Sequence, residues 1–214
     1  MFEPTARTTV RRHPERGEYE QAAVEAILDE GLVAHVGVAV DGQPFVLPMV
    51  YARVDGHLYL HGSAASRLLR TLGAGAPVCV TVTLLDGIVL ARSAFHHSMN
   101  YRSVVILGRA VAVTDTAERE RALAAMVDHA VPGRSEEVRA PDRRELAATL
   151  VVRVALDEVS AKVRHGPPID DPADLEIPVW AGVLPLRLVA GDPSPDGPSD
   201  RPLPPALAAW RQEV

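Results

Sequence analysis

Two adjacent histidines, His96 and His97, lie in the stretch from Ser93 to Tyr101 and are the most unusual pair of chemistry-bearing side chains in the sequence. Imidazole gives and takes protons near neutral pH, so one of the pair could protonate a reduced substrate. We predict that both lie on a strand, where successive side chains point to opposite faces and only one can face a ligand. No partner cluster for a metal is evident. Acid–base or substrate contact, haem or metal ligation, and a structural role all stay open.

A second candidate site is the run of hydroxyl and basic side chains Ser63, Ser66, Arg67 and Arg70. If a helix begins after Ser63, its unpaired amides and positive dipole end can receive a dianion such as a phosphate group. Arg67 would add a charge-assisted hydrogen bond to the same group. The alternative for these residues is a capped helix with a solvated basic face.

The elements that must hold these residues follow from apolar periodicity and turn signals. The apolar spacing from Tyr19 to Glu30 predicts a helix that Gly31 ends. Asp-Gly pairs at residues 41–42 and 55–56 predict two tight hairpin turns, because both turn residues must tolerate positive φ. The three strands that these turns separate are Leu32–Val40, Pro44–Val54 and His57–Leu60.

Two more helices and four more strands complete the predicted fold. Ala64–Leu72 is typical of a short helix with Ser63 as its N-cap, and Thr116–Ala130 of a longer one capped by Asp115 or Thr116. Six meandering strands would close into a small antiparallel barrel, because closure removes exposed edges. The later strands are Pro77–Leu85 and Ile88–Phe95, joined by a hairpin at Asp86-Gly87, then Arg102–Thr114 and a seventh at the barrel edge, Leu150–Leu156.

Length, charge and composition limit the class of protein. The 214 residues, 47% of them hydrophobic, suit one domain, which we place at residues 18–190 between an N-terminal arm (1–17) and a Pro-rich tail (191–214) with a short helix around Ala206–Arg211. A formal net charge of −6 argues against a general nucleic-acid binder. The N-terminus has no apolar stretch for a signal peptide or membrane anchor, and the lone Cys79 cannot form an intramolecular disulfide, so we expect a cytoplasmic protein.

Three segments together carry a resemblance to a known family: GQPFVLPMVY at residues 42–51, LYLHGSAASR at 58–67 and YRSVVILGRA at 101–110. In this combination and order the sequence resembles the FMN-binding split-barrel flavoproteins. Within them it is most similar to the pyridoxamine 5′-phosphate oxidase-related, nitroimidazole-resistance-type branch. The resemblance runs from about Leu32 to Leu186, and it implies a mainly β fold with flanking helices, a six-stranded antiparallel FMN-binding split barrel.

The resemblance also implies the cofactor and its site. FMN would lie at the interface of a homodimer, with Pro48, Met49 and Val50 offering backbone groups to its ring. The residues expected around its phosphate are His61, Gly62, Ser63 and Arg67. Arg102 and Ser103 would contribute polar side chains from the next long strand, and Trp180 would reach the flavin of the other subunit.

The implied activity is electron transfer between FMN and a small organic substrate, such as a nitro compound, with a nicotinamide as electron source. True pyridoxamine phosphate oxidases carry an arginine and a lysine where this chain has Leu47 and Ala52, which argues against pyridoxamine phosphate as the substrate. Two other functions stay open. One is a haem-binding split barrel with His96 or His97 as the axial ligand, and the other is a non-catalytic flavin-binding stress protein.

Overall fold

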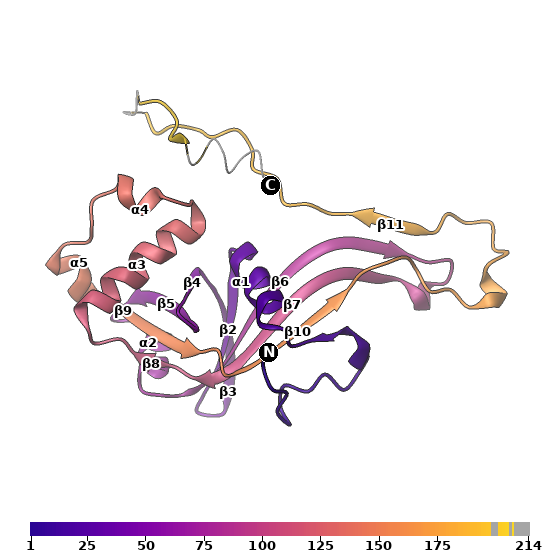
Figure 1. Cartoon of the computed structure of the whole chain (residues 1–214), viewed down its shortest axis with the longest axis horizontal. Helices are drawn as coiled ribbons and strands as arrows, with labels where there is room; N and C mark the ends of the chain where they lie inside the picture. The colour runs from indigo at the N-terminus through magenta and orange to yellow at the C-terminus, as the bar shows by residue number, and fades with distance from the viewer. Residues whose placement is uncertain (198–200, 206, 208–214) are drawn as a thin grey trace.

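Two antiparallel sheets form most of the protein in the computed structural model, which describes residues 1–197, 201–205 and 207 (Figure 1). The larger sheet has the strand order β1-β10-β7-β6-β2-β3, and β11 pairs with β6 beside this path. Its strands are β1 (Gly17–Glu18), β2 (Ala34–Val40), β3 (Gln43–Met49), β6 (Pro77–Leu90), β7 (Ser98–Arg109), β10 (Glu158–Arg164) and β11 (Gly182–Pro185). The smaller sheet contains, in order, β4 (Tyr51–Val54), β5 (His57–Ser63), β9 (Thr149–Ala155) and β8 (Val111–Ala112).

Helices flank these sheets. They are α1 (Gln21–Glu30), α2 (Arg67–Gly73), α3 (Thr116–Ala130), α4 (Arg134–Glu137) and α5 (Arg143–Ala148), with 3-10 turns at Pro14–Arg16, Ala94–His96 and Pro172–Asp174. The mainly β, antiparallel class with flanking helices is confirmed, although the described residues form eleven strands rather than six. Within the described ranges, no helix is both long and apolar enough to cross a membrane.

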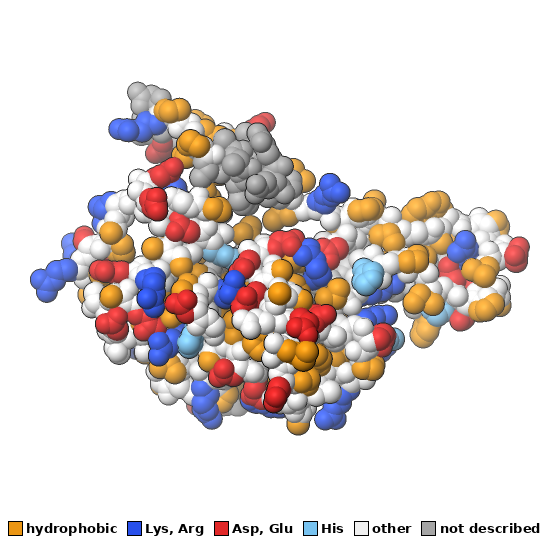
Figure 2. Space-filling model, in the orientation of Figure 1, with side chains coloured by type: hydrophobic (Ala, Val, Ile, Leu, Met, Phe, Trp, Pro, Cys, Tyr) orange, Lys and Arg blue, Asp and Glu red, His pale blue; other side chains and the backbone are white. Residues whose placement is uncertain are grey.

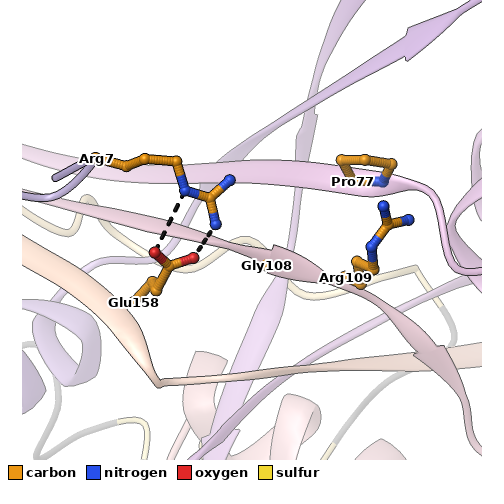
Figure 3. Close-up of a pocket in the computed structure, with 5 residues that line it drawn as sticks. All are labelled: Arg7, Pro77, Gly108, Arg109 and Glu158. Atoms are coloured by element: carbon orange, nitrogen blue, oxygen red, sulfur yellow. Dashed lines mark hydrogen bonds and ion pairs between the residues drawn. The ribbon is translucent and has the colours of Figure 1, made fainter. Parts of the chain in front are cut away.

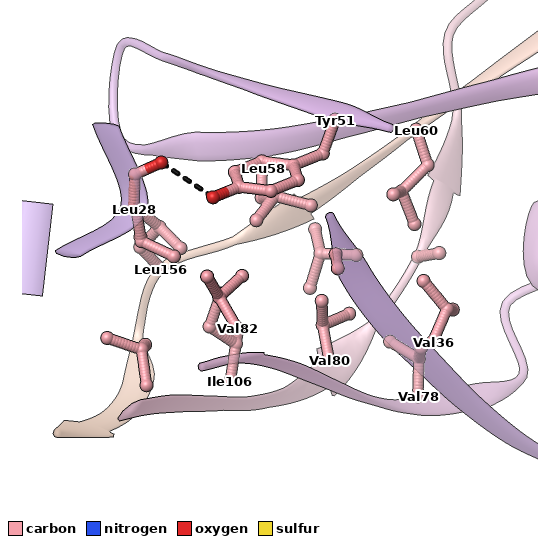
Figure 4. Packing of buried hydrophobic residues seen from close by; sticks show 14 of the residues in the cluster. Leu28, Val36, Tyr51, Leu58, Leu60, Val78, Val80, Val82, Ile106 and Leu156 are labelled. Atoms are coloured by element: carbon pink, nitrogen blue, oxygen red, sulfur yellow. Dashed lines mark hydrogen bonds between the residues drawn. The ribbon is translucent and has the colours of Figure 1, made fainter. Parts of the chain in front are cut away.

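The hydrophobic core lies where the two sheets face each other (Figure 4). Leu58 and Leu60 of β5 and Ile106 of β7 are fully buried, as is Tyr51 of β4. The Tyr51 hydroxyl lies 2.6 Å from the carbonyl oxygen of Leu28, so the end of α1 is fastened to the barrel. Because alternate strand residues face the same side, the period-two apolar pattern decides which face of each sheet is inside.

The first two predicted turns are confirmed. Both residues of Asp41-Gly42 have positive φ (52° and 78°), and so do both residues of Asp55-Gly56 (46° and 72°). The segment predicted as one strand, Pro44–Val54, is instead interrupted at Val50, so that β3 belongs to the larger sheet and β4 to the smaller one. This interruption is the corner at which the chain passes from one sheet to the other.

The third predicted turn, Asp86-Gly87, is wrong. β6 runs through it with a β-bulge between Leu85 and Gly87, and the chain reverses later, at Ala91–His97. Gly87 is needed for a close approach: a Cβ there would lie 3.1 Å from the carbonyl oxygen of Leu184 on β11. The glycine therefore admits a neighbouring strand instead of making a turn.

The helix ends also differ from their predicted causes. Gly31 does follow the last residue of α1, but its φ of −73° needs no glycine. A Cβ at Gly31 would lie 2.4 Å from Cγ1 of Val82, so close packing explains this glycine. Ser63 is not an N-cap, because α2 begins three residues later than expected and Ser66 accepts the capping hydrogen bond. Asp115 caps α3 as predicted.

The strand predicted at the barrel edge, Leu150–Leu156, is another correction. It forms β9, which lies between β5 and β8 inside the smaller sheet. The adjacent β9 residues Val151 and Val152 point to opposite faces of the sheet, and both are fully buried. One face of β9 packs on the core and the other lies beneath helices, which is why its apolar run is continuous. The short helix predicted around residues 206–211 lies outside the described residues.

A projecting arm extends β6 and β7 beyond the barrel, with β11 along the free edge of β6 (Figure 1). We use "the arm" for residues 85–101 and 166–185. Hydrophobic side chains gather over this projection in Figure 2. The large apolar side chains that it exposes include Leu85 (44% exposed), Phe95 (89%), Met99 (51%), Trp180 (67%) and Leu184 (51%).

Candidate functional site

A hollow of about 230 Å³ lies between β2, β3 and the start of α2. The strands supply apolar walls, and α2 supplies a hydroxyl and a cation. The lining residues are Val38, Val40, Phe45, Leu47, Ser66, Arg67 and Leu68. An apolar pocket with a few polar groups at one end suits a flat organic ligand that carries an anion.

Arg67 is the cation of this hollow. Its guanidinium carbon lies 4.7 Å from the centre of the Phe45 ring, so a cation–π contact orients the group. In the part of the chain that the structure describes, the Arg67 side chain has no hydrogen bond or ion pair. An exposed, oriented guanidinium without a carboxylate partner is suited to bind a phosphate.

The neighbouring edge of β3 offers backbone groups. β3 ends the strand order of its sheet, so one of its edges lacks a strand partner among the described residues. Pro44 and Pro48 have no N–H and stand four residues apart, which directs both nitrogens to this outer edge. Along that edge Val46 offers both N–H and C=O, and Pro48 offers C=O. Of the three residues predicted to meet a flavin ring, Pro48 and Val50 are exposed and Met49 is partly buried. Pro48 and Met49 both pair with β2, opposite His35 and Ala34.

The other residues predicted around the phosphate do not line the hollow. Gly62 packs on Leu69 of α2, and Ser63 Oγ accepts a hydrogen bond from the main chain of Ala65 at 3.1 Å. His61 precedes Gly62 on β5, so its side chain points to the opposite face of the sheet. The structure thus separates His61 from Arg67, although both come from one sequence motif.

The imidazole of His61 has unusual surroundings. It is half-buried on β5, where its paired residue on β9 is Val151. Its Nδ1 atom is buried and has no hydrogen-bond partner within the described residues. Burial lowers the pKa of His61, which keeps the ring neutral at physiological pH. A neutral imidazole with an unpaired nitrogen is chemically a metal or haem ligand.

Arg102 and Ser103 are engaged elsewhere. Arg102 donates to Asp86 at 2.8 and 3.0 Å and to Glu30 at 2.8 Å. The carboxylates of Glu30 and Asp86 raise the pKa of Arg102. Ser103 Oγ donates to the carbonyl oxygen of Lys162 at 3.3 Å. In this structure Arg102 fastens α1 to β6 and β7, and a cofactor contact for either residue stays a prediction.

His96 and His97 lie at the tip of the arm and not on a strand, which corrects the argument from strand alternation. His96 Nε2 lies 3.2 Å from Oδ2 of Asp171, and His97 Nδ1 lies 2.9 Å from the carbonyl oxygen of Ser93. Asp174 brings a third possible metal-ligand atom near His96 and Asp171, all within 4.8 Å of one another. Because Asp171 is mostly exposed, this grouping does not by itself identify a metal site.

Trp180 also belongs to the arm. It directly precedes the β11 region and is 67% exposed. A Cβ on Gly182 would lie 2.8 Å from two atoms of its indole ring, so the glycine makes room for the ring. Neither Trp180 nor the two arm histidines line the hollow of their own chain.

A second hollow, of about 370 Å³, lies near the N-terminal segment (Figure 3). Its two cations already have partners: Arg7 forms an ion pair with Glu158, and Arg109 donates to the carbonyl oxygen of Gly75 at 2.6 Å. The hollow beside Arg67 is therefore the better candidate. Sequence reasoning found Arg67 but missed Phe45, although Phe45 and Leu47 alternate on the strand that carries the resemblance.

Comparison with known proteins identifies the family and the fold of the chain. A family model described as pyridoxamine 5′-phosphate oxidase matches residues 20–163. A candidate 5-nitroimidazole antibiotic resistance protein from Bacteroides thetaiotaomicron has 23% identity and a TM-score of 0.58, over 69% of this chain and 86% of that one. The split-barrel fold that the resemblance implied is confirmed. No curated protein matches the sequence.

Two solved structures are much more similar. The flavocytochrome Anf3 from Azotobacter vinelandii is 41% identical, with a TM-score of 0.91, over 98% of each chain. An FAD- and haem-binding protein from Mycobacterium smegmatis is 39% identical, with a TM-score of 0.86, over 92% of this chain and 97% of that one.

Proposed function

This chain belongs to the pyridoxamine 5′-phosphate oxidase family, and on that premise we propose that it is a redox protein that binds a flavin in the hollow beside Arg67. The observation that carries the proposal is the pairing of an apolar wall with an oriented cation that has no ion-pair partner in the described residues. When bound, a flavin would supply the electron transfer. The chain itself would position it and exclude water.

Each part of a flavin has a counterpart here. The Phe45 and Leu47 side chains would cover one face of the ring system, which is flat and largely apolar. The outer edge of β3, with the N–H and C=O of Val46 and the C=O of Pro48, would hydrogen-bond the polar rim of the ring. Arg67 would bind a phosphate oxygen. These residues come from two adjacent elements, so their spacing is fixed by the fold.

We further propose that the flavin is FAD rather than the FMN expected from the sequence. The relative from Mycobacterium smegmatis, 39% identical, is an FAD- and haem-binding protein. A dinucleotide is larger than a hollow of about 230 Å³ can hold, so part of it would extend beyond the hollow. That part needs further protein surface.

A second copy of the chain is our proposed source of this surface. The arm exposes large apolar side chains, including Phe95 at 89% and Trp180 at 67%. Patches of this kind mark protein interfaces more often than free surfaces. In a homodimer the arm would be covered, and Trp180 could approach the flavin of the other subunit.

We also propose that the protein binds haem. Both of the more similar solved structures point to haem: one is a flavocytochrome and the other is an FAD- and haem-binding protein. The structure fits such a group in one respect, because His61 offers a neutral imidazole with an unpaired nitrogen. A flavin can accept two electrons from a nicotinamide, and a haem exchanges one electron at a time. A protein with both groups could therefore pass electrons from a nicotinamide to a small organic acceptor, such as a nitro compound.

We also propose a cytoplasmic location, which the lone Cys79 supports because it cannot form an intramolecular disulfide.

The flavin proposal is tested by replacing Arg67. We expect R67A to weaken flavin binding by about 1.5–3 kcal/mol, roughly 10- to 150-fold in Kd, the usual contribution of a charge-assisted hydrogen bond. R70A is the matched control, since Arg70 lies one turn later and does not line the hollow. Titration of cofactor-free protein with FAD and with FMN, followed by flavin fluorescence, measures both variants. Equal affinity of R67A and wild type would contradict the proposal.

The redox role needs its own measurement. The absorption spectrum and the mass of the released cofactor identify what the purified protein carries. Mixing with a reduced nicotinamide without oxygen should then bleach the flavin bands. A protein that binds flavin but is never reduced would instead be a non-catalytic flavin-binding protein.

A further inference from the structure

The arm leaves the barrel through a narrow part of the larger sheet. β2 pairs with β6 only as far as Val82, and β10 pairs with β7 only as far as Tyr101. β11 joins β6 beyond these points, from Gly87 onward. In the described part of the chain, β6 and β7 are therefore the only strands that continue from the barrel into the arm (Figure 1). We use "the neck" for residues 83–87 and 100–103.

The neck has the features of a place where a sheet can bend. Its β-bulge, between Leu85 and Gly87, interrupts the regular pairing of β6 with β7. A bulged strand bends, and a ribbon of two strands twists more than a wide sheet. The backbone pairing of the neck therefore does not by itself fix the angle between arm and barrel. Side chains that connect the neck with its surroundings are needed to fix that angle.

One arginine connects the neck with α1. Arg102 on β7 donates two hydrogen bonds to Asp86 across the neck, at 2.8 and 3.0 Å. The same guanidinium group donates to Glu30, the last residue of α1, at 2.8 Å. Because α1 packs on the barrel core, this ion-pair network joins the bulge to the barrel. The three side chains are between 31% and 55% exposed, so dissolved salt screens the network.

A second arginine connects the neck with the segment that follows β10. Arg164, the last residue of β10, is 7% exposed and is the only charged residue that is buried in the described ranges. It donates to the side chain of Asn100 in the neck, to the carbonyl oxygen of Gly166 at 3.3 Å and to that of Pro167 at 3.2 Å. The Asn100 amide group also donates to the carbonyl oxygen of Gly166, at 3.2 Å.

The contacts of Arg164 differ from those of Arg102. Arg164 has no carboxylate partner among the described residues, and burial lowers the pKa of its guanidinium group. A buried charge of this kind is tolerated where several acceptors surround it. The planar guanidinium fork reaches acceptors on two segments at once, which the single ammonium group of a lysine does less well. Arg164 is therefore suited to hold β7 and residues 166–167 in one arrangement.

We propose that the neck is a hinge and that Arg102 and Arg164 set its angle, so that the arm is held in one orientation relative to the barrel. Salt can release the Arg102 contacts, because their carboxylate partners are exposed. It leaves the buried Arg164 contacts in place. The inference goes beyond the proposed function and does not depend on a flavin. Where the arm meets a second chain, the same angle decides where Trp180 lies.

The experiment measures the distance between two spin labels on the full chain by double electron–electron resonance. A22C on α1 and A94C at the tip of the arm carry the labels, since both alanines are exposed. C79S removes the only native cysteine, and the chain with these three substitutions is the parent chain. Labelled chains are diluted into an excess of unlabelled chains, so that the distance is measured within one chain.

We expect one narrow distance peak for the parent chain at low salt, and loss of that peak in R164Q, R164K and R102Q. Salt at about 1 M should broaden the parent peak as R102Q does, because the Debye length is then about 3 Å. R109Q is the matched control and should keep the narrow peak. Arg109 also lies on β7 and donates to a main-chain carbonyl group, that of Gly75, but outside the neck.

Amide exchange of the barrel core checks that each variant folds. N100A, which removes the side-chain acceptor of Arg164, replaces R164Q in the test if R164Q does not fold. A narrow, unshifted peak at low salt in R102Q, or in the variant that tests Arg164, would overturn the inference, and so would a broad peak in the parent chain. The distance within one chain requires neither a dimer nor a flavin, so failure of those proposals is seen separately.

Discussion

The barrel and the arm are built from the same two strands, yet they differ in how many of their apolar side chains are exposed. In the barrel, Val80 and Val82 of β6 and Val104 of β7 are at most 1% exposed. Further along the same strands, in the arm, Leu85 is 44% exposed and Met99 51%. Strand sequence alone therefore does not determine burial. What differs is the second layer that covers the strand.

The barrel half has a complete layer of this kind, and the arm half has only a partial one. The smaller sheet and α1 pack on the barrel half of β6 and β7. In the arm, β11 adds to the edge of β6. One face is partly covered, since Val89 is fully buried and Ala91 is 5% exposed, whereas Leu85 and Met99 stay exposed. A two-stranded hairpin is barely stable alone in water, and a small sheet needs a hydrophobic face to be stable. We infer that the barrel is stable within a single chain, whereas the exposed apolar side chains of the arm are covered by another molecule.

The largest expected effect separates the two regions by stability. L58A removes a fully buried side chain of the barrel and should lower the free energy of unfolding by about 2–5 kcal/mol through the cavity that it leaves. L184A on the arm, where Leu184 is 51% exposed, should lower it by less than roughly 0.5 kcal/mol in the monomer. Urea unfolding at low protein concentration measures both. If L58A and L184A lowered the free energy of unfolding by similar amounts, the proposed difference in stability between barrel and arm would be wrong.

Self-association should show the reverse order. Introducing a charge at Phe95 or Trp180, as in F95D and W180D, should weaken the dimer at least about tenfold, since an apolar anchor of an interface contributes more than about 1.4 kcal/mol. V111D is the control, because Val111 is 53% exposed on β8 outside the arm. Sedimentation equilibrium gives the dissociation constants. A monomeric wild type at micromolar concentration would show that the arm is not a dimer interface.

The joint between α1 and the barrel gives a smaller effect. Tyr51 lies 2.6 Å from the carbonyl oxygen of Leu28 and 2.7 Å from that of Gly31, and burial raises the pKa of its hydroxyl, so the group stays protonated. Y51F leaves these buried carbonyls without their donor and should destabilise the protein by about 1–2 kcal/mol. Thermal unfolding measures the change. An unchanged melting temperature would mean that another donor replaces the hydroxyl.

The last prediction concerns the effect of low pH on the tip of the arm. Burial alone would raise the pKa of Asp170, but hydrogen bonds from the main chain and guanidinium group of Arg92 outweigh it and hold the pKa below its usual value. A carboxyl group of this kind stabilises the fold above its unfolded pKa of roughly 4 and loses that contribution as the pH falls toward its folded pKa.

Amide exchange in residues 165–175, measured against the intrinsic rate, should therefore rise below about pH 4. The barrel core should show no matching change. D170N should exchange faster at neutral pH and lose the acid dependence. The same acid dependence in D170N would assign the effect to another group.

The turns illustrate how far the sequence predicts this fold. Asp41-Gly42 and Asp55-Gly56 were predicted correctly because each turn depends on its own two residues. Asp86-Gly87 has the same local signal, but Arg102 binds Asp86 and β11 packs on Gly87, both from far along the chain. Local chemistry identifies a turn only where no distant strand competes for it.

The site shows the same limit. Arg67 was predicted from its place near a helix start, and the structure brings it into the hollow. His61 was grouped with it through the family resemblance, which implies that both residues lie around the cofactor phosphate, yet strand alternation directs His61 to the other face. The partners of Arg102, Glu30 and Asp86, come from other elements and leave no sequence signal. The arm histidines were misplaced because the reversal was predicted too early.

The two prolines of β3 have a consequence for solubility. A strand edge that lacks a partner and carries exposed valine and leucine side chains would normally pair with strands of other molecules, which leads to fibrils. Pro44 and Pro48 remove two of the backbone donors from that edge, so an incoming strand meets gaps on both sides of Val46. A small planar ligand needs only one or two hydrogen bonds and still finds them at Val46. The edge can thus accept a cofactor while refusing another β-strand.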